Sequence, residues 1–110
     1  MSFEISSEND VTVVDVSGQL IVGNRHQLKD AVLEQVEGGA RKFLVNFADT
    51  AYIDSSGLGV LVSLSKKVRE KGGELRLSGL NEDLRTLFEL TKLDTLFHIA
   101  ENRAQALKDF

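Results

Sequence analysis

The sequence lacks several residue types whose chemistry would otherwise decide a function. It has no Cys, no Pro and no Trp, and only two His. Without cysteine the chain has neither disulfides nor thiolate metal sites. Without proline, Gly, Asn and Asp must provide all the turns. Disulfide scaffolds, thiolate metal centres and cysteine chemistry are therefore excluded.

Excess positive charge and long apolar runs are also missing. The chain has 13 Lys and Arg against 17 Asp and Glu, a net charge of −4, so nucleic acid is not the predicted partner. The densest basic run, Lys66 to Lys71, is typical of a solvated helix face. No apolar run approaches the roughly 20 residues that span a bilayer, and the start lacks signal-peptide character. We expect a cytoplasmic protein with no membrane insertion.

The hydrophobic pattern alternates between strands and helices along one domain, residues 1–110. Alternation or β-branched runs predict strands, and apolar positions at helical spacing predict helices. Asn24 with Gln27 is predicted to form a capping box. The expected strands are 3–5, 11–16, 43–47, 74–78 and the 93–99 region. The expected helices follow residues 24, 54 and 81, and a last one covers residues 101–110.

This order, β-β-α-β-α-β-α-β-α, predicts the α/β class. Helices between strands imply right-handed crossovers and a mixed, mainly parallel sheet of about five strands with about four helices. The turn residues Glu8–Asp10 predict an N-terminal β-hairpin. We expect the loops 18–24 and 48–56 to lie together, because each follows the carboxyl end of a strand.

The stretch Asp54-Ser55-Ser56-Gly57 precedes an apolar run with helical spacing. Each of its first three residues is a good helix N-cap, and the first turn of a helix offers free N–H groups and partial positive charge. A phosphate would be stabilised there. The residues alone leave open a phosphorylatable switch and a plain helix cap with glycines for close packing.

Two catalytic interpretations fail on missing residues. A P-loop ends in Gly-Lys-Ser or Gly-Lys-Thr, and Ser-Ser-Gly-Leu-Gly has no lysine. A nucleophile elbow needs a Gly two residues before the serine and a partner histidine. His26 is expected to be solvated in a helix start and His98 to be structural. We expect no enzyme, since no titratable cluster converges on the serines.

The run 52–61, Tyr-Ile-Asp-Ser-Ser-Gly-Leu-Gly-Val-Leu, resembles the signature of the STAS domain, in particular the anti-sigma factor antagonists. The resemblance extends over nearly the whole chain, through the hairpin, the 17–20 turn, the 43–47 strand and the 93–99 tail. It implies a βα superhelix around one sheet, in agreement with the predicted element order.

The resemblance implies a partner-switching function. Ser55 corresponds to the phosphoacceptor, with Ser56 as the fallback, and Asp54 and Gly57 would support that site. The unphosphorylated protein would bind an anti-sigma factor that is also a serine kinase, and phosphorylation would release it. The kinase would supply the ATP, with no cofactor or metal of the chain's own, and a PP2C-type phosphatase would reset the switch. The implied partner-binding residues are Leu20, Ile21, Asn24, Asp54, Ser55, Ser56 and Leu58.

One position departs from the family pattern. Ile21 stands where many antagonists resembling this chain carry an aspartate, and neither Val22 nor Gly23 restores a carboxylate. Leu20, Ile21 and Val22 are predicted either to form a hydrophobic docking patch or to pack under the sheet end. The alternative function is a non-switching STAS subunit or adaptor, for example in a lipid-transporting ABC complex. The oligomeric state stays open.

Overall fold

One mixed sheet organises the protein. The computed structural model describes residues 1–110, and its five strands lie in the order β1-β2-β3-β4-β5. Strand β1 pairs antiparallel with β2, and every later pair is parallel. The predicted α/β class and mainly parallel sheet are confirmed. The strand bounds are β1 Ser2–Glu8, β2 Val11–Leu20, β3 Lys42–Ile53, β4 Glu74–Ser78 and β5 Ile99–Ala100.

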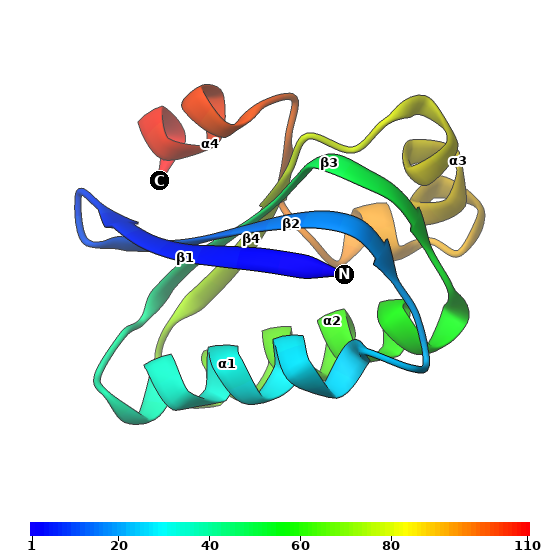
Figure 1. The fold of residues 1–110 in the computed structure, drawn as a ribbon. Coiled ribbons are helices and arrows are strands. Elements are labelled where there is room, and N and C mark those ends of the chain that lie inside the picture. Colours follow the sequence, from blue (N-terminus) through cyan, green and yellow to red (C-terminus); the bar gives the residue numbers. More distant parts are fainter.

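Helices cover both faces of the sheet (Figure 1). Helices α1 (Arg25–Glu37) and α2 (Ser55–Glu70) lie side by side on one face. This is the expected result of two right-handed crossovers that add strands in the same direction. Helix α4 (Arg103–Asp109) packs on the opposite face, and α3 (Glu82–Leu90) connects β4 to a short 3₁₀ turn, Leu93–Thr95.

The sheet separates two hydrophobic clusters of unequal size. The larger lies between the sheet and the α1–α2 layer and includes fully buried Phe43, Phe47 and Leu61. The smaller lies beneath α4 and consists of Val11, Val13, Leu44, Ala100 and Ala106. Residues 43–45 are all buried because β3 is covered on both faces, as its continuous apolar run predicted.

The N-terminal hairpin closes through Asn9 and Asp10, with φ of 52° and 67°. Two consecutive positive φ values at the centre of a two-residue loop are the pattern of a type I′ turn, which suits the twist of paired strands. Asn and Asp tolerate this conformation better than most side chains do. The hairpin predicted at Glu8–Asp10 is confirmed.

Strands β2 and β3 run further than the sequence predicted. Residues 17–20 pair in parallel with residues 49–53, with register shifts after Asp15 and after Gly18. The buried Thr50 hydroxyl donates to the Val16 carbonyl at 2.8 Å, and Gly18 takes φ of 86°. Part of each stretch predicted as a loop is thus a bulged extension of the sheet, in which polar residues pair through their backbones, while residues 21–24 and Asp54 lie outside the strands and helices.

The C-terminal region also differs from the prediction. The expected strand across 93–99 is a 3₁₀ turn followed by only two strand residues, Ile99 and Ala100. Lys92, with φ of 64°, redirects the chain there. The exposed His98 contributes its backbone carbonyl, which accepts from the Leu77 N–H at 3.0 Å. None of the helices has the length and apolar character that crossing a membrane requires.

Candidate functional site

The candidate site lies where the ends of β2 and β3 meet the start of α2. Leu20 pairs with Ile53, the last residue of β3, and α2 begins at Ser55. Helix α1 starts five residues after Leu20, so the 21–24 connection lies beside the same end of the sheet. The two stretches expected to share one end of the sheet do lie together.

Asp54 joins these elements through its backbone and its carboxylate. Its N–H donates to the Leu20 carbonyl at 3.0 Å. Its Oδ1 accepts from the Gly57 N–H at 2.8 Å and from the Ser56 hydroxyl at 2.6 Å, and its Oδ2 accepts from the Val22 N–H at 3.0 Å. Asp54 is the N-cap of α2, as predicted, and it also holds the 21–24 connection against the helix start.

These donors stabilise the charged form of the carboxyl. The Ser56 hydroxyl has the largest effect, followed by the Gly57 N–H, and together with Val22 they hold the pKa of Asp54 below its ordinary value against an opposing effect of burial. A carboxylate that accepts several hydrogen bonds resists protonation because the bonds favour the charged form. The site therefore carries a fixed negative charge at neutral pH.

The structure distinguishes the two neighbouring serines. Ser55 is the first residue of α2, is exposed and makes no side-chain hydrogen bond, whereas Ser56 is half-buried and donates to Asp54. The Ser56 hydroxyl is held toward Asp54 in the helix cap, whereas Ser55 is open to solvent. Of the two, Ser55 alone offers a free, accessible hydroxyl, a difference that residue types alone did not reveal.

Gly57 allows α2 to approach the end of β2 closely. A Cβ built on Gly57 would lie 2.6 Å from the Leu20 carbonyl oxygen and 2.9 Å from Ile53 Cγ2. Neither neighbour can move without displacing a strand end, so any larger residue would push the helix away from the sheet. Gly57 supports the site by its missing side chain.

Two leucines that were expected to contact a partner, Leu20 and Leu58, do not lie on the surface. Leu20 is 0% exposed and Leu58 is 7% exposed, so both belong to the core. For the run Leu20–Val22 we predicted either a docking patch or packing under the end of the sheet, and Leu20 packs under the sheet. Val22 alone is strongly exposed, at 63%, and Ile21 is half-buried. Any apolar docking patch is therefore limited to Ile21 and Val22.

The capping box predicted at Asn24 is also wrong. The Asn24 side chain makes no cap hydrogen bond to α1. Instead its Oδ1 accepts from the Ile21 N–H at 3.0 Å, and its Nδ2 donates to the Gln19 carbonyl at 2.9 Å. Asn24 shapes the 21–24 connection by satisfying its backbone, while His26 lies exposed in the first turn of α1, as expected.

Sequence reasoning missed two contributors to this end of the molecule. The Val22 N–H, which receives the second oxygen of Asp54, is a backbone group and left no signal in the residue types. Tyr52 pairs with Gln19 in the strand extension and is 50% exposed beside the site. The structure groups no three His, Asp or Glu side chains in a way that could hold a metal ion.

Comparison with known proteins shows the family of the chain. The STAS domain family matches residues 2–106. The chain belongs to the STAS domain family. It is 35% identical over 94 residues to the anti-sigma-B factor antagonist of Bacillus subtilis, covering 86% of this chain and 84% of that relative.

Solved structures share the STAS fold over nearly the full length. A putative anti-sigma factor antagonist from Thermotoga maritima superposes with a TM-score of 0.91 at 28% identity, covering 97% of this chain and 92% of the other. The phosphorylated form of the Bacillus cell fate determinant SpoIIAA has a TM-score of 0.76 at 19% identity, with 98% of each chain covered. The second likeness concerns the fold alone.

Proposed function

We propose that this STAS domain is an anti-sigma factor antagonist switched by phosphorylation of Ser55. The observation that carries the proposal is the exposed, unbonded hydroxyl of Ser55 beside a serine whose hydroxyl is held by Asp54. The names of the antagonist relatives support an anti-sigma factor as the partner. That this partner is also a serine kinase is part of the proposal. SpoIIAA supports the idea that this fold tolerates a phosphoryl group.

The chemistry at Ser55 is a phosphoryl transfer. The Ser55 oxygen forms a bond to the γ-phosphorus of ATP held by the kinase, the bond from that phosphorus to the bridging oxygen breaks, and ADP leaves. The hydroxyl proton passes to a base of the kinase, because both Asp54 oxygens already accept hydrogen bonds from the protein. Asp54 positions the helix start rather than acting as the base. A PP2C-type phosphatase would hydrolyse the phosphoserine and reset the switch.

The switch acts through charge. Phosphorylation adds about −1.5 to −2 charge next to the ionised Asp54, on a chain whose net charge is already −4. The N-terminus of α2 accommodates this charge within the protein. A partner surface that accepts the neutral serine must then meet several negative charges, and its complex weakens. Release follows without a change of fold.

The test combines the host's anti-sigma factor kinase and ATP with three variants. We expect intact mass to show one added phosphoryl group in the wild type and in Ser56→Ala, and none in Ser55→Ala. We expect Ser55→Asp to bind the anti-sigma factor at least about tenfold more weakly than the wild type does. The reason is that the complex would bury a carboxylate without a partner. If Ser55→Asp binds as well as the wild type, the switch is wrong.

Co-purification of the same variants from the host tests the alternative function. A non-switching subunit, such as one of a lipid-transporting ABC complex, would co-purify with a membrane ATPase regardless of the residue at position 55. Ser55→Ala and Ser55→Asp would then retain equal amounts of that ATPase. That result would replace the proposed switch with a constitutive binding role.

A further inference from the structure

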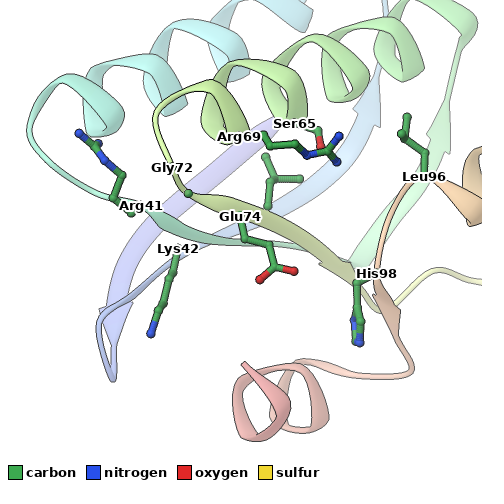
Figure 2. A pocket seen from close by; sticks show the side chains of 10 residues that line it. Arg41, Lys42, Ser65, Arg69, Gly72, Glu74, Leu96 and His98 are labelled. Atoms are coloured by element: carbon green, nitrogen blue, oxygen red, sulfur yellow. The ribbon is translucent and has the colours of Figure 1, made fainter.

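A hollow of about 460 Å³ lies at the opposite end of α2 from Ser55. Figure 2 shows it between the last turns of α2, the start of β4 and the segment before β5. Ser65 follows Ser55 by ten residues, and at about 1.5 Å rise per residue the two lie about 15 Å apart along the helix. The hollow is therefore separate from the proposed switch.

A backbone donor faces this hollow from the edge of β4. Strand β5 pairs with β4 only at Leu77 and Ser78, where the Leu77 N–H donates to the His98 carbonyl. Alternate residues of a parallel strand direct their N–H groups to the same side. The Leu75 N–H therefore points to the side of Leu77, where no strand covers it. Leu75 lines the hollow, so its N–H is available to a ligand.

Ser65 supplies a second donor. The residue is 5% exposed and lines the hollow, yet its hydroxyl makes no hydrogen bond within the protein. The hydroxyl does not bond back to the preceding turn of its helix, as that of Thr91 does to Leu87. The Ser65 oxygen is accessible to solvent rather than sealed in the core, so its hydroxyl can donate to a ligand in the hollow.

Arg69 adds a free positive charge. Its guanidinium takes part in no ion pair or hydrogen bond within the protein, whereas Arg76 and Arg103 are both paired with carboxylates. Figure 2 shows the Arg69 guanidinium beside Ser65, with Leu96 across the hollow. Lys42, Glu74 and His98 point to the other side of the sheet.

Two nearby negative features, the carbonyls at the end of α2 and the Glu74 carboxylate, could oppose the binding of an anion in the hollow. Carbonyls at the C-terminal end of α2 carry partial negative charge, which opposes it. However, the Val68 carbonyl is already occupied, accepting from Gly73 at 2.9 Å and from Lys71 at 3.1 Å. The Glu74 carboxylate is 3.1 Å from the Arg76 guanidinium, which offsets its charge. The free side-chain groups on the α2 side of the hollow, those of Ser65 and Arg69, are donors.

We propose that this hollow binds a small molecule bearing an oxyanion, a carboxylate or a phosphate. The guanidinium of Arg69, the hydroxyl of Ser65 and the N–H of Leu75 hold its oxygens. Charge-assisted bonds from a guanidinium suit both groups. A volume of about 460 Å³ falls in the range of sites for small organic molecules and exceeds the needs of a single inorganic ion.

The test is a titration of the unphosphorylated, partner-free protein with citrate and with inorganic pyrophosphate at constant ionic strength. Changes in amide NMR chemical shifts locate the binding site. We expect these changes to saturate and to be centred on Ser65, Arg69 and Leu75. Arg69→Gln should weaken binding by about tenfold or more, as the loss of a charged hydrogen bond does. Ser65→Ala should weaken it less. Lys66→Gln removes the same charge from α2 outside the hollow and should bind as the wild type does.

The two titrations, with citrate and with pyrophosphate, also identify the class of ligand. Saturation by citrate alone supports a carboxylate ligand, saturation by pyrophosphate alone a phosphate, and saturation by both an oxyanion of either kind. The proposal is overturned if neither probe saturates, or if Lys66→Gln weakens binding as much as Arg69→Gln. Arg69 is exposed, so its variant should fold, and amide spectra without probe verify this. Because no kinase is used, the result is independent of Ser55 phosphorylation.

Discussion

Asp54 shows how one side chain can order a site whose other members are mostly backbone groups. Its two oxygens receive the Ser56 hydroxyl and the N–H groups of Gly57 and Val22, which come from different elements. The neighbouring Ser55 is exposed, and its side chain makes no hydrogen bond within the protein. A helix cap and the proposed phosphoacceptor are thus compatible in one arrangement, although the sequence posed them as alternatives.

At this scale we predict that Ser56→Ala raises the pKa of Asp54. The Ser56 hydroxyl is the largest cause of the lowered pKa, so its loss should move the pKa of Asp54 toward its ordinary value, near 3.8. Carboxyl-carbon NMR across an acid titration measures it. Ser55→Ala is the matched control and should leave the pKa of Asp54 unchanged. Equal values in both variants would contradict the assigned cause.

The lowered pKa also sets the sign of a stability change with pH. Asp54 has a lower pKa folded than unfolded, so its stabilising effect is present above about pH 4 and is lost as pH falls through the folded value. The difference in free energy of unfolding between the wild type and Ser56→Ala should therefore shrink on acidification. Urea unfolding over that range measures it, and a difference that grows instead would contradict this linkage.

Helix α2 carries Ser55 at its start and lines the proposed oxyanion site near its end. Its two glycines, Gly57 and Gly59, have opposite effects on packing. Gly57 faces the ends of β2 and β3, where an added Cβ would lie within 3 Å of their atoms. Gly59 is exposed, and an added Cβ would meet nothing within 4 Å. The sequence treats the two alike, and only the packing of the helix distinguishes them.

We therefore predict opposite effects of the same substitution within one helix. Gly57→Ala should lower the free energy of unfolding by about 1–3 kcal/mol, because the methyl group overpacks a rigid contact. Gly59→Ala should raise it by about 0.5–1 kcal/mol, because alanine favours the helix over the unfolded chain. Chemical denaturation of both variants measures this. If Gly57→Ala is as stable as Gly59→Ala, the close approach does not constrain the helix.

The whole molecule holds the Ser55 site on a broad, buried support. The site is built from the ends of β2 and β3, whose fully buried Leu20 and Ile53 anchor it in the larger core. Ser55 itself is exposed and outside that core. A charge added there meets solvent and the helix N-terminus rather than apolar side chains.

At this scale we predict that phosphorylation leaves the fold intact. Amide NMR shifts should change around residues 20–24 and 52–59 and stay constant in α3 and α4. The free energy of unfolding should change by no more than about 1 kcal/mol, the usual effect of an anion at a helix N-terminus. Shift changes throughout the sheet would show instead that release involves a conformational change.

The sequence by itself determined the element order, the hairpin turn, the parallel centre of the sheet and the position of Asp54 as a cap. These depend on local propensity and on hydrophobic periodicity, which residue types record directly. It also placed the Ser55–Ser56 pair at a helix start, where phosphate is favoured. It could not distinguish the two hydroxyls.

Only the tertiary structure decided which groups occupy Asp54, which apolar residues reach the surface and how far β2 and β3 extend. Leu20 and Val22 differ little in residue type, yet one is buried and the other exposed, because the pairing of Leu20 with Ile53 directs its side chain into the core. Backbone pairing, as between residues 17–20 and 49–53, depends on strands distant in sequence and needs no particular side chains. Contacts of this kind arise from the packed fold, and local patterns do not encode them.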